Sequence, residues 1–349
     1  MSSNRIDYID LAKGISICLV MLFHIKGIKD VSYDPIVESV LFSSCMVPPF
    51  FFIAGAFFRE GDRFRKFLIK KVNSLLVPFV FFYLMSAVII PNLTHQLFGM
   101  NYNTVLGWES LWAFIWPGEY PNIPLWFLWC LFLTNLLFWA IHRLGERFFP
   151  NHARLAMLGM VSCCAVMGFY FAHLLNADIG NLCNMLKYVP IFFLGHIMAE
   201  KDMFRKLDNS RMEPSRKGLI LLILIAVIAL TSYFLGETDM NFLRFYVYGI
   251  AGSFTVIILA SWIVRLPLIS YLGRYSIILL LTHGILLRMG TPFVIRASEY
   301  IDPYYTALMF WIVMALSYLV IIPLAIRFLP HVTAQKQLFD TEDLASKRD

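Results

Sequence analysis

Long runs of apolar residues alternate with short polar segments along almost the whole chain. Ten of these runs are close to the length of about 20 residues that an α-helix needs to cross a membrane. They cover residues 8–26, 36–58, 72–91, 123–142, 154–175, 182–199, 217–235, 243–264, 268–290 and 304–329. Lipid offers no water to the backbone, and a barrel would need strands of alternating polarity. All ten runs are therefore predicted to be transmembrane helices.

The composition points to the same class of protein. Hydrophobic residues make up 59% of the 349 residues and charged residues 15%, with a mean hydropathy of +0.69. A soluble domain carries about 25% charged residues, so this chain lacks the polar surface to cover a soluble core. The same figures exclude a disordered chain. We predict an all-α, polytopic membrane bundle over residues 1–330 and a short polar tail over residues 331–349.

Lys and Arg residues are concentrated in alternate loops. If the N-terminus lies inside, 23 of the 29 Lys and Arg residues fall on inside segments and 6 fall outside. Because basic loops favour the cytoplasmic side, both termini are predicted to be cytoplasmic. The net charge of +6 therefore reflects membrane orientation and gives no indication of a nucleic-acid partner. No cleavable signal peptide is predicted, since acidic residues stand where its basic segment should be.

The first run carries the densest set of ionisable residues, each costly in a membrane and so a functional candidate. Lys13 and His24, eleven residues apart, fall on one helix face, with Asp10 beside them. The axial separation of Lys13 and His24 is roughly 16 Å. This spacing suits a cation at the cytoplasmic mouth of a groove and a proton acceptor near its outer end. The alternative is that Lys13 and Arg5 reach lipid phosphates while His24 marks the outer interface.

Three further candidates lie later in the chain. His283, in the ninth run, is expected at a depth similar to that of His24, so the two histidines would line one cavity. The alternative is that His283 bonds to the backbone of a neighbouring helix. Lys70 and Lys71 precede the third run and either pair with the phosphates of a soluble donor or anchor the loop at the membrane.

Two further patterns, one aromatic and one polar, are also candidates for function. The outer loop 92–122, rich in Trp and Tyr, either stacks on sugar rings or lies among lipid headgroups. His173 and Asp178 form an H-x4-D pattern known from glycerolipid acyltransferases, but they fall at the outer end of the fifth run. The six cysteines lack metal-ligand spacing, so we expect no metal site and no disulfide framework.

The opening segment RIDYIDLAKGISICLVMLFH resembles the signature of the acyltransferase family 3 membrane proteins, R-x3-L-D-x2-R-G followed by a distal His. The matching positions are Arg5, Asp10, Gly14 and His24. Ile9 stands in place of Leu and Lys13 in place of Arg, which removes the bidentate fork of a guanidinium. Similar segments are VPPFFFIAGAFF, KKVNSLLVPF, PLWFLWCLF, FFLGHIMAE and LGRYSIILLLTHGILL. The resemblance spans most of the chain and is closest to short members that acetylate sugars, the fucose 4-O-acetylase-like group.

The resemblance implies an acetyltransferase of the bacterial cytoplasmic membrane. Cytoplasmic acetyl-CoA would donate an acetyl group to a hydroxyl of a cell-envelope or lipid-linked sugar at the outer side, with membrane lipids around the protein and no permanently bound cofactor. The expected catalytic residues are His24, as general base, Asp10 and His283. The expected donor-binding residues are Lys13, Arg5, Lys70, Lys71 and Arg274. The expected acceptor-binding residues are Trp116, Tyr120 and Trp126.

Two other functions fit the same pattern. A transporter or flippase for a lipid-linked or amphipathic substrate would also have ten spans and buried histidines. It would move its substrate without acetyl-CoA. An inactive relative that binds or senses a ligand is the other alternative, and its support is the replacement of Arg by Lys13.

Overall fold

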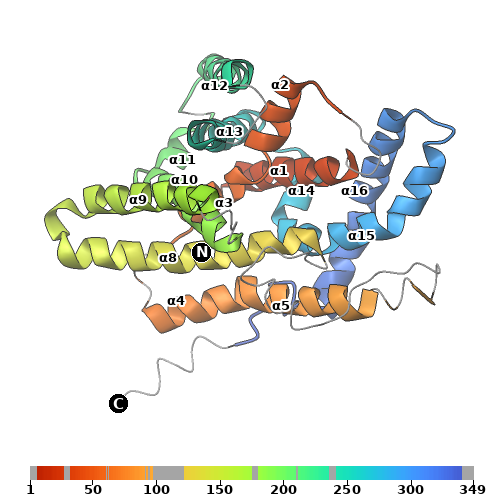
Figure 1. Ribbon diagram of the computed structural model, residues 1–349, viewed down its shortest axis with the longest axis horizontal. Helices are drawn as coiled ribbons and strands as arrows, with labels where there is room; N and C mark the ends of the chain where they lie inside the picture. Colours follow the sequence, from red (N-terminus) through yellow and green to blue (C-terminus); the bar gives the residue numbers. More distant parts are fainter. Residues whose placement is uncertain are drawn as a thin grey trace. The chain divides into compact units, whose positions relative to one another are not determined.

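The protein is all-helical throughout the part that the computed structural model describes (Figure 1). The described residues are 6–26, 32–59, 61, 63–90, 92, 95–96, 122–174 (backbone only at 172–174), 180–209, 211–235 and 241–339. The main helices are α1 (Asp7–Lys26), α2 (Pro35–Glu38), α3 (Pro48–Ala56), α4 (Phe64–Lys71), α5 (Val77–Leu84), α8 (Trp126–Phe148), α9 (Ala153–Leu174), α10 (Asn181–Glu200), α11 (Met203–Lys206), α12 (Pro214–Leu235), α13 (Phe242–Ile263), α14 (Pro267–Arg274), α15 (Ser276–Ala297) and α16 (Pro303–Phe328).

Ten helical segments within these residues are long and apolar enough to cross a membrane, and each overlaps one predicted run. The predicted fold class is thus confirmed. The limits of the third and ninth runs differ most from the prediction. The third segment runs from Phe64 to Ile89, because Phe67 is buried and packs against Trp139, which extends the apolar face into the basic stretch. The ninth predicted run divides at Tyr275 into the short helix α14 and the long helix α15.

The chain forms two compact units, each built from separate stretches of sequence. The first unit comprises residues 1–58, 191–279 and 290–318. Within it, α1 packs against α3, α13 and α14, and α12 lies alongside α13 (Figure 1). Two glycines let α3 and the second half of α10 touch along their backbones. A Cβ atom at Gly55 would lie 1.9 Å from the Phe192 carbonyl oxygen, and one at Gly195 would lie 1.8 Å from that of Phe52. Small residues at such contacts are typical of membrane helix packing.

The second unit comprises residues 59–190, 280–289 and 319–349. Here α8 lies between α9 and the segment formed by α4 and α5 (Figure 1). Asn73, in the short helix η2 (Val72–Leu76) that joins α4 to α5, binds the described end of the C-terminal segment. Its Oδ1 accepts hydrogen bonds from the backbone of Leu338 and Phe339, and its Nδ2 donates to the Phe339 carbonyl at 2.8 Å. Residues 331–339 are therefore held against this helix.

Candidate functional site

Two of the predicted polar residues meet in the first half of α1. The carboxylate of Asp10 and the ammonium group of Lys13 lie 2.9 Å apart, one helical turn from each other. The side chains are 15% and 25% exposed, respectively, so the pair is largely shielded from solvent. Because both residues lie on one helix, the helix itself positions this ion pair. Asp10 therefore fixes the position of the Lys13 ammonium group.

The short helix α14 brings a third predicted residue to this pair. A Cβ atom at Gly273 would lie 1.8 Å from the carbonyl oxygen of Asp10, and one at Gly14 would lie 2.0 Å from that of Ile269. The two backbones therefore touch, which is possible only because both positions are glycine. This contact carries Arg274, the last residue of α14, to the first turns of α1. Asp10 and Arg274 line one cavity of about 210 Å³, which we call the Asp10 cavity.

The lining of the Asp10 cavity is mostly polar, with two arginines, two aspartates, a serine and a tyrosine. Its remaining lining residues are Asp7, Arg265, Pro267, Ser270 and Tyr271. Burial raises the pKa of the Tyr271 hydroxyl above its ordinary value, and the neighbouring Tyr275 acts in the same direction, whereas Arg274 lowers it. The hydroxyl is thus protonated at neutral pH and offers a hydrogen-bond donor to an anionic group.

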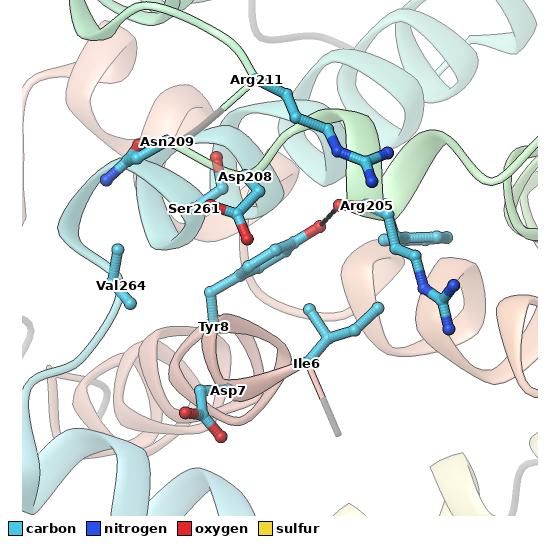
Figure 2. A pocket seen from close by; sticks show the side chains of 10 residues that line it. Ile6, Asp7, Tyr8, Arg205, Asp208, Asn209, Arg211, Ser261 and Val264 are labelled. Atoms are coloured by element: carbon cyan, nitrogen blue, oxygen red, sulfur yellow. Dashed lines mark hydrogen bonds between the residues drawn. The ribbon is translucent and has the colours of Figure 1, made fainter. Parts of the chain in front are cut away.

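A second cavity, of about 360 Å³, surrounds Tyr8 at the start of α1 (Figure 2). We call it the Tyr8 cavity. It shares Asp7 with the Asp10 cavity, and its lining residues are Ile6, Asp7, Tyr8, Phe204, Arg205, Asp208, Asn209, Arg211, Ser261 and Val264. The Tyr8 hydroxyl donates a hydrogen bond to the Phe204 carbonyl oxygen. By sequence, Arg205 and Arg211 were counted only among the positive charges of a predicted cytoplasmic segment. The mixture of Arg, Asp and Asn in so short a loop was the available signal.

A lysine at the start of the seventh predicted run is bound to residues near the Tyr8 cavity. Lys217, in the first turns of α12, is fully buried. Its ammonium group donates to the carbonyls of Leu207 and Ser261 and to the side chain of Asn209. The Ser261 carbonyl belongs to the last turn of α13, where carbonyl groups have no partner within the helix. Lys217 therefore caps α13 and ties the loop after α11 to it. The next residue after α13, Val264, adopts φ +70°, a conformation that is rare for a β-branched side chain.

Substitution of Lys217 by Met is expected to destabilise the protein by about 2–4 kcal/mol, because buried acceptors then lack their donor. Thermal unfolding of the detergent-solubilised protein measures the effect. The control is Lys206→Met, since Lys206 is exposed on α11. Equal midpoints for the two variants would contradict the capping role of Lys217.

His24 lies near the opposite end of α1. Its Nδ1 atom is 2.8 Å from the carbonyl oxygen of Val20. A carbonyl oxygen only accepts hydrogen bonds, so Nδ1 carries the hydrogen, and in the neutral ring Nε2 holds the lone pair. The ring is partly buried and packs edge-on against Phe23, with ring centroids 5.6 Å apart. A separation of fourteen residues places His24 roughly 21 Å along the helix from Asp10.

The end of α1 beyond His24 is anchored by residues that sequence reasoning missed. The ammonium group of Lys26 forms an ion pair with Glu38, the last residue of α2. The same group lies 5.4–5.9 Å from the ring centres of Phe23, Tyr33 and Phe42. Cation–π contacts of this kind are stabilising, more so when desolvated. The anchor holds the helical turn that carries His24.

Four of the predicted site residues that the structure describes belong to the second unit. His283 is fully buried on α15, and Trp126, at the start of α8, lies with its ring 6.5 Å from that of Tyr188. Lys70 and Lys71 end α4, and Lys71 lies 5.7 Å from the centre of the Phe67 ring. His24 and His283 belong to different units, so the predicted cavity shared by the two histidines stays a prediction.

Asn122 is a further polar residue beside His283. Its Nδ2 donates to the carbonyl of Leu281 at 2.9 Å. A Cβ atom added at Gly284 would lie only 2.2 Å from the Oδ1 atom of Asn122. Asn122 thus packs tightly onto the residues that flank His283. Arg5, Trp116, Tyr120 and Asp178, together with the side chain of His173, lie outside the described residues, and the roles expected for them stay predictions.

The geometry describes an integral membrane protein with polar cavities around the beginning of one transmembrane helix and a histidine near its other end. The sequence profile of acyltransferase family 3, described as an acyltransferase domain, matches residues 6–326, and the chain belongs to this family. The protein is therefore a membrane acyltransferase. No protein of curated function and no solved structure gives a significant match to the chain.

Proposed function

We propose that the protein is an O-acetyltransferase of the bacterial cytoplasmic membrane. It transfers the acetyl group of cytoplasmic acetyl-CoA to a hydroxyl of a cell-envelope or lipid-linked sugar at the outer side. Both termini, and with them the Asp10 and Tyr8 cavities, face the cytoplasm in this proposal. The distribution of Lys and Arg among the loops supports this orientation.

The hydrogen bond of His24 is the observation that carries the proposal. With Nδ1–H bound to the Val20 carbonyl, the lone pair of the neutral ring lies on Nε2, the nitrogen that acts as proton acceptor in this proposal. A general base needs this arrangement, and histidine supplies it near physiological pH. The hydrogen bond also fixes the ring, so the base does not have to be oriented in each catalytic cycle.

The reaction then follows from the roles of the groups along α1. Nε2 of His24 accepts the proton of the sugar hydroxyl as its oxygen attacks the thioester carbonyl carbon. The carbon–sulfur bond breaks, and the thiolate takes a proton from the imidazolium ring. The products are the acetyl ester and free CoA, and the ring is neutral again. A donor held near Lys13 must present its thioester roughly 16 Å further along the helix, a distance that the pantetheine arm can bridge.

The other predicted residues act at the two ends of this path. Lys13, positioned by its ion pair with Asp10, and Arg274 in the Asp10 cavity attract the negatively charged donor. Lys70 and Lys71 add positive charge on the same side of the membrane. In the proposal, His283 and Trp126 lie toward the outer side of the membrane, where the acceptor sugar binds. Trp126 offers an aromatic face to a sugar ring.

Comparison of envelope glycans from cells with and without the gene tests the proposal. Mass spectrometry should show a component heavier by one acetyl group that disappears with the gene and returns when the gene is restored. Purified protein in detergent should also release CoA from acetyl-CoA only when the acceptor glycan is present. The same glycan masses in both strains would refute the proposed activity.

A further inference from the structure

We propose that the Tyr8 cavity binds the phosphorylated nucleoside end of the acetyl donor, with Arg205 and Arg211 as the phosphate-binding residues. This inference rests on the proposed function, because it assumes a coenzyme A thioester as donor. It assigns the donor's charged end to residues that neither the family signature nor the basic loop before the third transmembrane segment contains.

The size and lining of the cavity suit a polar ligand of moderate size. At about 360 Å³ it falls within the range of small-molecule sites, near the lower end. Figure 2 shows the carboxylate of Asp208 beside the Tyr8 ring, and both guanidinium groups on the side toward which the Tyr8 hydroxyl points. Guanidinium groups bind phosphate through two parallel hydrogen bonds, which makes Arg the preferred residue for this purpose.

The charges of the lining distinguish a nucleotide from a simple anion. The lining contains two arginines and two carboxylates, Asp7 and Asp208, so its formal charge is close to neutral. A bare inorganic anion gains little in such a cavity. A molecule with anionic phosphates and also with hydroxyl and amino groups is complementary to it, because the carboxylates accept hydrogen bonds from those neutral donors.

The segment that carries the arginines, which is α11 and the loop after it, is held at several points. The Tyr8 hydroxyl binds the carbonyl of Phe204, and Lys217 binds the carbonyl of Leu207 and the side chain of Asn209. Arg205 also lies 3.5 Å from the carboxylate of Asp202. Preorganised groups bind a ligand more tightly because less conformational entropy is lost on binding. Lys217 is therefore a positioning residue for the phosphate-binding loop.

The position of the cavity also constrains the shape of the donor. Tyr8 and His24 are sixteen residues apart on one helix, which corresponds to roughly 24 Å along its axis. A compact acyl donor, such as an acyl phosphate, cannot occupy the Tyr8 cavity and reach His24 at the same time. An elongated donor, with its phosphates at one end and its thioester at the other, can.

A donor that lacks the nucleoside and the phosphates distinguishes a loss of phosphate binding from a loss of folding or of catalysis. The double variant Arg205→Ala/Arg211→Ala and the wild-type protein are compared with acetyl-CoA and with S-acetylpantetheine, which lacks the nucleoside and the phosphates. We expect kcat/KM for acetyl-CoA to fall about 10- to 100-fold, through KM, and that for S-acetylpantetheine to stay unchanged. The inhibition constant of adenosine 3′,5′-bisphosphate against acetyl-CoA should rise by a similar factor.

The matched control is Arg216→Ala. Arg216 lies in the same basic stretch, is 76% exposed and pairs with Glu213, and it does not line the cavity. An equal loss with both donors, or no loss with either donor and unchanged inhibition, would overturn the assignment. Absence of acetyl transfer by the wild-type protein from both donors would instead refute the proposed function.

Discussion

Replacement of His24 by alanine is expected to lower the rate of acetyl transfer about 10²- to 10⁴-fold, the usual contribution of a general base. The reason is chemical, because no other group is proposed to take the hydroxyl proton at that point of α1. The ring is only partly buried, so its removal should leave the protein folded in the membrane. Transfer from acetyl-CoA to the acceptor glycan, measured with purified protein in detergent, gives the rate.

The control for this variant is His152→Ala, since His152 is exposed in the turn between α8 and α9. It should retain both activity and thermal stability. Added imidazole should restore part of the activity of the His24→Ala protein, because a free base can replace the missing ring, whereas a merely structural defect would not respond. Full activity of His24→Ala without imidazole would refute the assignment of the base.

Replacement of Gly273 by alanine is expected to lower the free energy of unfolding by about 3 kcal/mol, which is the upper end of typical overpacking effects. The added Cβ would lie 1.8 Å from the Asp10 carbonyl oxygen and 2.4 Å from the Gly14 nitrogen, and both are backbone atoms. A side chain can change its rotamer, but two helix backbones can only move apart. That movement would take Arg274 away from Asp10 and open the Asp10 cavity. Thermal unfolding and acetyl-CoA binding measure the two consequences.

A matched glycine on another helix tests the cause. Gly159 lies within α9, where a Cβ atom would meet nothing within 4 Å. Gly159→Ala should be neutral or stabilising by up to about 1 kcal/mol, since alanine favours the helix. If Gly273→Ala unfolded at the same temperature as Gly159→Ala, the close approach of α1 and α14 would be wrong.

Apolar run length predicted all ten membrane segments, because a span leaves its signature in about 20 consecutive residues. The predicted ends of the segments were wrong where packing against other helices determines where a helix begins or ends. Helix α4 extends the third segment toward the N-terminus through contact of Phe67 with Trp139. Helix α14 was merged with α15 in one apolar run, although it ends at Arg274 and packs on α1. Continuous hydrophobicity does not record where a helix is interrupted.

Likewise, some residues of the candidate site could be predicted from the sequence and others could not. The residues of the first run were found from the sequence, because helical spacing places Asp10, Lys13 and His24 on one helix. Lys217, at the start of the seventh predicted run, and Arg211, in the loop before it, were counted only as charges on the predicted inside, since a count of charges does not distinguish a buried cation from an exposed one. The burial of Lys217 depends on the loop after α11 and on the end of α13.

By itself, the sequence determined the membrane class, the ten candidate spans among the described residues, the family and the polar residues of α1, since each of these is encoded in consecutive residues. The tertiary structure alone decided that Arg274 shares a cavity with Asp10, that Lys217 caps α13, and that Arg205 and Arg211 share a cavity with Tyr8. These contacts join residues distant in the chain, and they depend on glycine-mediated approach of backbones and on buried hydrogen bonds. No local pattern of residues specifies such partners, because each depends on how whole helices pack.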